Sequence, residues 1–386
     1  MSVPTILLSA GEASSDMYAA RLARDLRERT GARIFGMGGP RMAEAGVELI
    51  ADYHGVAVVG IAEVLHKIPS VVSVQNRLAR EAVRRKADLA ILVDSPGTHL
   101  GVARRLKPKK IPVGYFIGPQ IWAWRAGRVR IVRRRVKKMV VIFPFEEPIY
   151  RDAGVPVEFV GHPLVDVVKP TKSREQFVAE HGLDPEKPIV ALLPGSRKNE
   201  IARNYPIIAQ ACAAIVRGRG RASDSQFVLV AAPGLSPELF APYAEPSLKI
   251  HRVEGSAYDA LAAADCAIVA SGTATIEAAL LGTPMVVVYR VSPVSAFLAR
   301  PLIRTKFFAM PNLIAGRQVV PELIQDAFTV AALEKETRRL IDSPDARDEM
   351  RLALKQVSAK LGPGGAIERA ADVFTALLSE QSANQR

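Results

Sequence analysis

The stretch "CAIVASGTATIEAALLGTPMVVVYR", Cys266 to Arg290, contains a complete strand–turn–helix–strand unit. Its two apolar runs, 266–270 and 285–289, are typical of buried strands, and the segment between them has room for a turn and a short helix. Strands joined by a helix run parallel, so the unit predicts a parallel sheet. Ser271, Gly272 and Thr273 stand where the helix begins, which is where proteins present backbone N–H groups to anions.

The same alternation of apolar runs and helix-period stretches occurs twice along the chain. We expect strands in the first half at 5–10, 33–39, 87–94, 111–118, 138–145 and 157–163, with helices at 16–29, 71–85 and 127–136. A polar linker with a short helix spans 168–187, and strands follow at 188–196, 226–233, 248–254, 266–271 and 284–290. After Pro321 the pattern is wholly helical, at 330–341, 346–361 and 366–378. This predicts two doubly wound α/β domains, with ligands at the carboxyl ends of the strands in a cleft between them.

Composition fits a two-domain globular protein of 386 residues, 49% hydrophobic and 24% charged. The longest apolar stretch, 55–65, is too short to span a bilayer, and no secretory signal precedes the first strand, so we expect a cytoplasmic protein. Cys212 and Cys266 match no metal motif, which predicts buried thiols in a reducing compartment.

The net charge of +13 is unevenly distributed. Between Ser95 and Phe145 there are thirteen Lys and Arg residues and no Asp or Glu, and the segment 125–138 is the densest part. Such a block favours a polyanionic partner, whether nucleic acid, anionic lipid or a phosphorylated substrate. A solvated helix face is the alternative. Trp122 and Trp124 come just before the block, and such a combination suits base stacking or a lipid interface.

Two turns in the second half have the features of a nucleotide site. "LLPGSRKNEI", 192–201, ends a strand and enters a helix, and the guanidinium of its Arg197 can donate two parallel hydrogen bonds to phosphate oxygens. In the opening stretch, Glu277 lies four residues after Thr273 and shares its helix face. A carboxylate suits ribose hydroxyls better than bare phosphate, which favours a nucleotide. There is no Walker lysine and no G-x-G-x-x-G after a strand, so a dinucleotide cofactor is not expected.

Two polar turns in the first half are candidates for contact with a substrate. "SAGEASSD", 9–16, follows the first strand, and its Ser14 and Asp16 could meet a substrate. The alternative is that Ser15 or Asp16 simply caps the next helix. Asp94, in "ILVDSPGTHL", follows a buried strand and could act as a general base or cap the helix after it. The six histidines form no metal pattern, and we predict no metal or cofactor.

With these residues in view, the chain resembles the bacterial lipid-A-disaccharide synthases. The resemblance runs from Ile6 to about Ile324. It rests on "SAGEASSD", "GMGGPRM", "VDSPGTH", "WAWR", "FPFEEPIY", "FVGHPL", "LLPGSR", "ASGTATIEAALLGTPMVVVYR" and "MPNLIAGR". Each motif is weak alone, but their number and order are specific. The family usually has Gly at the position of Ser15, which puts a close backbone approach to the acceptor there in doubt.

The resemblance implies the GT-B glycosyltransferase fold of two Rossmann-like domains facing a cleft. The expected domains are 1–165 for the acceptor and lipid, 166–360 for the UDP-sugar, and 361–386 packing back on the first. The family joins UDP-2,3-diacylglucosamine to 2,3-diacylglucosamine 1-phosphate, with inversion and release of UDP and without a metal. Residue by residue, Asp94 matches the candidate base, Arg197 and 271–273 match the diphosphate elements, Glu277 matches the ribose carboxylate, and Asn312 matches a polar position near the donor.

Lipid-linked substrates also imply peripheral attachment to the anionic inner face of the bacterial inner membrane. We expect the apolar stretch 56–74 and the tryptophans to contact lipid, through Val58, Val59, Ile61, Val64, Leu65, Trp122 and Trp124. A homodimer is possible through the helical C terminus. Two alternatives stay open here: a UDP-N-acetylglucosamine 2-epimerase or other UDP-sugar transferase of the same fold, and a nucleic-acid-binding protein using 125–138.

Overall fold

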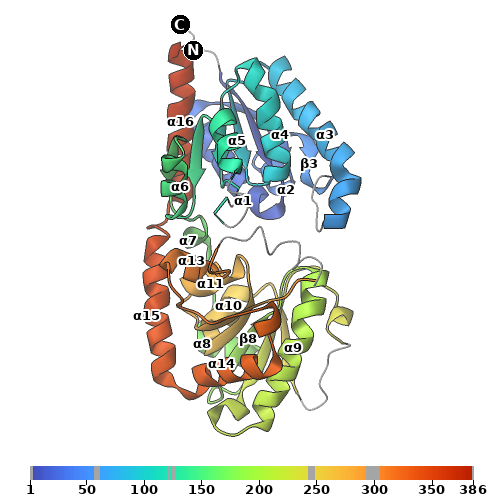
Figure 1. Cartoon of the computed structure of the whole chain (residues 1–386), viewed down its shortest axis with the longest axis vertical. Coiled ribbons are helices and arrows are strands. Elements are labelled where there is room, and N and C mark those ends of the chain that lie inside the picture. Colours follow the sequence, from blue (N-terminus) through green and yellow to red (C-terminus); the bar gives the residue numbers. More distant parts are fainter. Residues whose placement is uncertain are drawn as a thin grey trace. The chain divides into compact units, whose positions relative to one another are not determined.

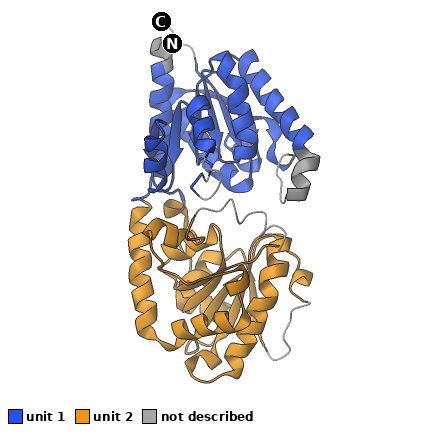
Figure 2. Ribbon diagram, viewed as in Figure 1, with its two compact units in different colours: residues 1–163, 362–386 blue, residues 164–361 orange. Residues whose placement is uncertain are grey.

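The structure is a computed structural model that describes residues 3–55, 61–119, 121–122, 127–241, 248–292 and 305–384, without the side chains of 61–67 and 381–384. The chain forms two compact units, 1–163 with 362–386 and 164–361 (Figure 2). Each unit contains one parallel sheet with helices packed on it (Figure 1). The predicted doubly wound α/β class is therefore confirmed.

The sheet of unit 1 has seven parallel strands in the order β3-β2-β1-β4-β5-β6-β7. They are β1 (Thr5–Ala10), β2 (Arg33–Gly38), β3 (Glu48–Asp52), β4 (Leu89–Val93), β5 (Val113–Phe116), β6 (Lys138–Val141) and β7 (Val157–Phe159). β4 is buried along its whole length, which explains its uninterrupted apolar run. The sequence did not predict β3, an edge strand with an acidic residue at each end and only Ile50 fully buried.

The helices of unit 1 are α1 (Ala13–Thr30), α2 (Pro40–Glu44), α3 (Ile61–Arg84), α4 (Pro96–Leu106), α5 (Arg128–Arg135), α6 (Glu146–Asp152) and α16 (Ala366–Asn384), with 3-10 turns at Tyr53–Gly55 and Lys107–Lys109. α16, red in Figure 1, packs against α1 and β6. Its Phe374 is fully buried, and a Cβ atom on Gly114 would lie 2.5 Å from that ring. The glycine in β5 thus makes room for the C-terminal helix.

Unit 2 has six parallel strands in the order β10-β9-β8-β11-β12-β13. They are β8 (Ile189–Leu193), β9 (Gln226–Ala231), β10 (Ile250–Glu254), β11 (Cys266–Ala270), β12 (Met285–Tyr289) and β13 (Glu322–Ile324). The prediction of a wholly helical chain after Pro321 is wrong at β13, which pairs with β12. Three residues are too few to show a strand period, so the sequence could not reveal this strand.

The helices of unit 2 are α7 (Leu164–Val167), α8 (Arg174–Glu180), α9 (Lys198–Arg217), α10 (Ala257–Ala263), α11 (Ala274–Leu280), α13 (Met310–Ala315), α14 (Val330–Asp342) and α15 (Pro344–Lys360), with 3-10 turns at Arg221–Asp224, Pro237–Leu239 and Gln325–Ala327. Cys212 on α9 and Cys266 on β11 are fully buried free thiols, as predicted. Burial raises the pKa of both thiols, so they stay protonated.

Candidate functional site

The strand order reverses once in each sheet, between β1 and β4 in unit 1 and between β8 and β11 in unit 2. Open parallel sheets bind ligands at the carboxyl ends of the strands at such switch points. Ala10 pairs with Val93 in unit 1, and Val269 pairs with Leu193 in unit 2. The loop with Glu12 therefore lies beside Asp94, and the Arg197 turn lies beside the turn 271–273.

The two turns at the switch point of unit 1 are in close contact. A Cβ atom placed on Gly11 would lie 2.2 Å from Ser95 Oγ and 2.5 Å from Ser95 Cβ. Asp94 and Ser95 are both left-handed, with φ of 54° and 46°. Such a conformation costs a residue with a side chain on the order of 1–3 kcal/mol and persists only where the surroundings impose it. The backbone around Asp94 is thus held in an unfavourable shape by its neighbours.

The Asp94 carboxyl is largely buried yet keeps part of its surface exposed. Burial raises its pKa to about 7, assisted by the negative charge of Glu12 and a hydrogen bond to it. A carboxyl of that pKa is partly ionised at neutral pH and can accept a proton from a hydroxyl. Sequence reasoning noted the loop that contains Glu12 but did not assign that residue a role, since only the pairing of β1 with β4 places it beside Asp94.

A second buried carboxyl near Asp94 was also missed. Glu146, at the start of α6, accepts a hydrogen bond from the Phe143 N–H at 3.2 Å. Burial raises its pKa to about 8, and the charge of Asp94 adds to that effect. The indole N–H of Trp122 opposes the rise, although no described residue accepts from it at hydrogen-bond geometry. Glu146 is therefore a largely protonated acid near the candidate base.

The loop that begins α1 uses its polar side chains mainly for local structure. Asp16 is buried, and its carboxylate accepts from the N–H groups of Gly39 at 2.7 Å, Arg41 at 3.0 Å and Met42 at 3.3 Å, which caps α2. Ser14 is exposed and donates to Glu12 Oε1 at 2.7 Å. Asp16 thus positions the "GMGGPRM" turn, while Ser14 stays available at the surface beside Glu12.

Ser15 stands where the family usually has Gly, and the structure accommodates it without backbone strain. It lies in the first turn of α1 and does not have a positive φ. Its Oγ accepts from the N–H groups of Gly11 at 3.2 Å and Glu12 at 3.0 Å. The serine therefore closes the turn after β1 at the amino end of α1.

In the turn 271–273 of unit 2, the three predicted residues differ in whether their N–H and hydroxyl groups are available to a ligand. Ser271 is already engaged, because its N–H donates to Val288 O at 2.9 Å and its hydroxyl donates to Phe308 O at 2.9 Å. No described residue accepts a hydrogen bond from the N–H of Gly272 or Thr273, both of which are exposed. Gly272 has φ 153° and, among the described residues, nothing within 4 Å of a Cβ placed on it. Gly272 and Thr273 are thus open donors at the beginning of α11.

Glu277 follows one turn along α11 and is mostly buried. Burial raises the pKa of its carboxyl, while the hydroxyl of Tyr258 lies 3.5 Å from Oε1 as a hydrogen-bond donor and opposes the rise. Tyr258 belongs to α10, and nothing in its sequence context indicated this contact. A partly desolvated carboxylate with one tyrosine partner has acceptor capacity left for a ligand hydroxyl.

Arg197 is the N-cap residue of α9, and its side chain is 55% exposed. Its guanidinium donates to Glu200 Oε1 at 3.0 Å, while Glu200 Oε2 accepts from the Ser196 N–H at 3.1 Å. The carboxylate of Glu200, within the first turn of α9, thus holds both the Arg197 side chain and the backbone of the preceding turn. An exposed ion pair of this kind contributes about 1 kcal/mol or less, so Arg197 can exchange Glu200 for a phosphate.

Asn312, on α13, is fully buried and saturated with hydrogen bonds. Its Oδ1 accepts from the N–H groups of Val319 at 2.6 Å and Val320 at 2.9 Å, and its Nδ2 donates to Val320 O at 2.9 Å and Glu322 Oε1 at 2.6 Å. Glu322 in turn accepts from the Phe308 and Ala309 N–H groups. Phe308 O is the acceptor of the Ser271 hydroxyl, so Asn312 is connected to the turn 271–273 through Glu322 and Phe308.

Comparison with known proteins identifies the family. The model of a family described as lipid-A-disaccharide synthetase matches residues 6–369. A protein of Solibacter usitatus named lipid-A-disaccharide synthase is 44% identical over 383 residues, 98% of this chain and 99% of the relative. One of the same name from Geobacter sulfurreducens is 42% identical over 378 residues, 97% of this chain and 98% of the relative.

The chain belongs to the lipid-A-disaccharide synthase family. This membership makes it a glycosyltransferase of lipid A biosynthesis and decides against the epimerase and nucleic-acid alternatives. Similar solved structures include a UDP-GlcNAc 2-epimerase from Neisseria meningitidis bound to UDP-GlcNAc, with TM-score 0.65 and 13% identity over 96% of this chain and 100% of that one. A calicheamicin glycosyltransferase gives TM-score 0.59 and 19% identity over 98% and 99%. At these identities the likeness shows the fold alone, and the fold expected from the family is confirmed.

The lipid contacts expected for a lipid-A-disaccharide synthase fall partly outside the described residues. This applies to Val58, Val59 and Trp124, and to the side chains of Ile61, Val64 and Leu65 on α3. One turn further along α3, Ile68 and Val72 are 47% and 38% exposed and share a face. Trp122 packs edge-on against Phe145, with ring centroids 5.2 Å apart. No helix in the described ranges is long and apolar enough to cross a bilayer.

The basic block of this synthase, 95–145, contains the helices α4 and α5, which pack against each other. α4 also packs on α3. Burial and the neighbouring Arg104 lower the pKa of Arg105 and of Arg135. Arg105 donates to Gln75 and Asn76 on α3, whereas Arg133 and Arg134 are exposed. The positive charge is therefore crowded on one set of helices next to the exposed apolar residues of α3.

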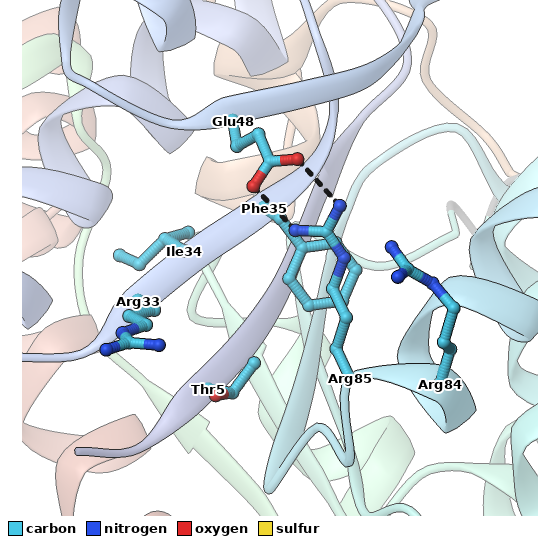
Figure 3. Close-up of a pocket in the computed structure, with 7 residues that line it drawn as sticks. All are labelled: Thr5, Arg33, Ile34, Phe35, Glu48, Arg84 and Arg85. Atoms are coloured by element: carbon cyan, nitrogen blue, oxygen red, sulfur yellow. Dashed lines mark hydrogen bonds and ion pairs between the residues drawn. The ribbon is translucent and has the colours of Figure 1, made fainter.

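A hollow of about 460 Å³ lies at the amino end of the strands of the unit 1 sheet, opposite the end that carries Asp94 (Figure 3). It is lined by Thr5, Arg33, Ile34, Phe35, Glu48, Arg84 and Arg85. Arg85 forms a two-pronged ion pair with Glu48, at 2.6 Å for each bond, and lies over the Phe35 ring. The ionic side chains of this hollow are largely paired, and the hollow is far along the strands from Asp94, so we assign it no part in the synthase reaction.

Among the described residues no group of His, Cys, Asp and Glu could hold a metal ion.

Proposed function

We propose that this chain transfers 2,3-diacylglucosamine from UDP to the 6-hydroxyl of 2,3-diacylglucosamine 1-phosphate. The products would be the β-1,6-linked disaccharide 1-phosphate and UDP, with inversion at the anomeric carbon. The observation that carries the proposal is the placement of Asp94, a carboxyl of pKa about 7, at the switch point of unit 1. Family membership supplies the class of substrates.

In the proposed step, ionised Asp94 accepts the proton of the acceptor 6-hydroxyl as its oxygen attacks the anomeric carbon. The bond between that carbon and the β-phosphate oxygen breaks, and its electron pair leaves with UDP. A single displacement from the opposite face inverts the α-linked donor into a β-linked product. General-base catalysis of this type contributes about 10²–10⁴-fold to a rate.

We further propose that unit 2 holds the UDP leaving group. The N–H groups of Gly272 and Thr273, from which no described residue accepts, and the guanidinium of Arg197 would donate to the diphosphate. These hydrogen bonds would strengthen as negative charge develops on the diphosphate. Ser271 would support this turn through its bond to Phe308 O, and Glu277 would accept from the ribose hydroxyls. Glu200 would release Arg197 when the diphosphate arrives.

Membrane attachment belongs to the same proposal, because both substrates carry acyl chains. We propose that the chain docks on the anionic inner face of the inner membrane, with the exposed apolar residues of α3 meeting lipid and the basic residues of α4 and α5 meeting headgroups. Ser14, exposed beside Glu12, is the remaining candidate for an acceptor contact.

A turnover assay with the two diacylated substrates tests the function. The unmutated chain should release UDP and form the disaccharide, and Asp94→Asn should lower kcat by about 10²-fold or more. UDP affinity, measured by calorimetry, should be unchanged in Asp94→Asn but about 10-fold weaker in Glu277→Gln, since a ribose contact is lost. Binding of inorganic pyrophosphate, which lacks ribose, should not respond to Glu277→Gln.

Absence of disaccharide from the unmutated chain would overturn the proposed reaction. A near-normal rate for Asp94→Asn would remove Asp94 as the base while leaving the substrates in place. Equal weakening of UDP and pyrophosphate by Glu277→Gln would show that the residue supports the diphosphate turn and does not bind ribose.

A further inference from the structure

Two buried side chains that the proposed reaction does not use donate to one atom, the backbone carbonyl oxygen of Asp94. The hydroxyl of Tyr115, on β5, lies 2.7 Å from that oxygen, and Nδ1 of His99, on α4, lies 2.7 Å from it. Both side chains are completely buried. Their rings meet edge to face, with centroids 6.3 Å apart.

The direction of each hydrogen bond in this group is fixed by chemistry. A carbonyl oxygen only accepts, so Nδ1 of His99 must carry the hydrogen. Burial lowers the pKa of His99 to about 4, so the ring is neutral and its Nε2 carries none. Nε2 therefore accepts from the hydroxyl of Ser9, 2.9 Å away on β1. Three neighbouring elements, β1, α4 and β5, thus converge on the residue that follows β4.

The carbonyl that they hold belongs to the left-handed turn described above. The hydrogen bonds at the start of α4 begin at the carbonyl of Ser95, which accepts from Thr98 and His99 N–H, so the helix does not satisfy the carbonyl of Asp94. Without Tyr115 and His99 this carbonyl would lose both donors, and the turn could relax to a less strained backbone. Such a change in φ and ψ would move the carboxyl of Asp94, since both groups are attached to the same Cα atom.

We infer that His99 and Tyr115 are positioning residues for the reaction: by donating together to the Asp94 carbonyl they fix the turn from which its carboxyl receives the acceptor proton. The inference rests on the proposed role of Asp94 as base. It assigns a function to a histidine and a tyrosine that are completely buried.

A matched pair of substitutions at His99 provides the test. The amide nitrogen of Asn occupies the place of imidazole Nδ1, whereas the longer Gln places its amide near Nε2. His99→Asn should therefore keep the bond to the Asp94 carbonyl, and His99→Gln should lose it while still reaching Ser9. We expect kcat of His99→Asn to stay within about 3-fold of the unmutated chain and kcat of His99→Gln to fall by about 10–100-fold.

Tyr115→Phe removes only the hydroxyl and keeps the packing of the ring, so it tests the second donor without a large risk to folding. We expect its kcat to fall by about 10-fold, with KM for both substrates and the affinity for UDP unchanged. Substitution of a residue that merely stabilised the fold would lower the thermal transition temperature and the amount of active protein. It would not lower kcat while leaving KM unchanged, and Asn at position 99 would not preserve activity better than Gln.

The inference is overturned if His99→Gln and Tyr115→Phe turn over normally while Asp94→Asn is inactive, a result that would leave the proposed function intact. It is also overturned if Asn and Gln at position 99 lower kcat equally. If Asp94→Asn itself is active, the proposed base fails and the positioning role fails with it.

Discussion

Asp94 lies next to the carboxyl of Glu12, and the two interact strongly enough to change how the base titrates. Burial is the largest cause of the raised pKa of Asp94, and Glu12 adds to it through charge and a hydrogen bond. Glu12 is in turn held at the amino end of α1, where its N–H donates to Ser15 Oγ and its carboxylate accepts from Ser14. The chemistry of the base thus depends on residues that follow a different strand, β1.

Glu12→Gln should shift the pH dependence of kcat in a defined direction. Removing the negative charge favours ionised Asp94, so its pKa falls and the acid limb of the profile moves to lower pH, by about one pH unit. Glu12→Asp keeps the charge and serves as the matched control. Turnover measured from pH 5 to 9 would check this, and an acid limb that moves to higher pH, or that does not move, would contradict the assigned interaction.

Residue patterns located most candidate groups but not their partners. Asp94 and Arg197 were recognisable because each follows a strand in a polar turn, and Glu277 because it lies four residues after Thr273 on the same helix face. Glu146 and Tyr258 gave no such signal, because their proximity to Asp94 and Glu277 depends on which strands and helices are neighbours. The sequence also pointed to Asn312 and Asp16 as candidate site residues. The structure adds that the side-chain oxygens of both accept hydrogen bonds from backbone N–H groups, such as that of Val319 for Asn312 and that of Gly39 for Asp16.

Among the elements, the turns after β1 and β4 fit together so tightly that one side chain excludes another. Gly11 does not have a positive φ, so alanine suits its backbone, yet the new Cβ would lie 2.2 Å from Ser95 Oγ. Both turns precede helices, α1 and α4, so a clash here displaces the beginning of each. The glycine is needed for packing at this position and not for backbone freedom.

Gly11→Ala should lower the free energy of unfolding by about 1–3 kcal/mol through this clash. Ser95→Gly removes both clashing atoms and leaves His99 Cε1, at 3.9 Å, as the nearest atom. In the Ser95→Gly background Gly11→Ala should therefore be nearly neutral. Urea denaturation of the four chains in this double-mutant cycle measures the coupling. Additive effects would show that the two turns are not in the described contact.

Periodicity predicted the long elements well and the shortest ones poorly. α14, α15 and α16 agree with their expected spans to within a few residues at most boundaries, since their apolar spacing continues over several turns. β3 and β13 were missed because an edge strand of three to five residues buries too little to show a pattern. Pairing with β2 and β12, which is a tertiary contact, is what makes them strands.

On the scale of the whole chain, an excess of positive charge coincides with apolar side chains left exposed on α3. The net charge is +13, and the thirteen cations of 95–145 face no acidic residue within that segment. Ile68 and Val72 are exposed on the helix that packs beside α4. Their combination is typical of a surface that meets an anionic bilayer.

Binding to vesicles that contain phosphatidylglycerol should weaken steeply as salt rises from 0.05 to 0.5 M, because screening shortens the reach of the basic helices. Arg133→Gln with Arg134→Gln should reduce binding at low salt, and Ile68→Ser with Val72→Ser should reduce the part that survives high salt. Co-sedimentation measures both. Binding indifferent to salt and to the arginine pair would refute the electrostatic contribution.

Local periodicity and motifs of a few residues were enough to predict the α/β class, the two domains, the family and the turns that carry chemistry. The strand order depends on tertiary contacts, and it creates the switch points that place Glu12 beside Asp94 and the Arg197 turn beside Gly272. The tertiary structure also decided that Tyr115 and His99 meet at one carbonyl. These relations join residues far apart in the chain, and no local pattern encodes which strands become neighbours.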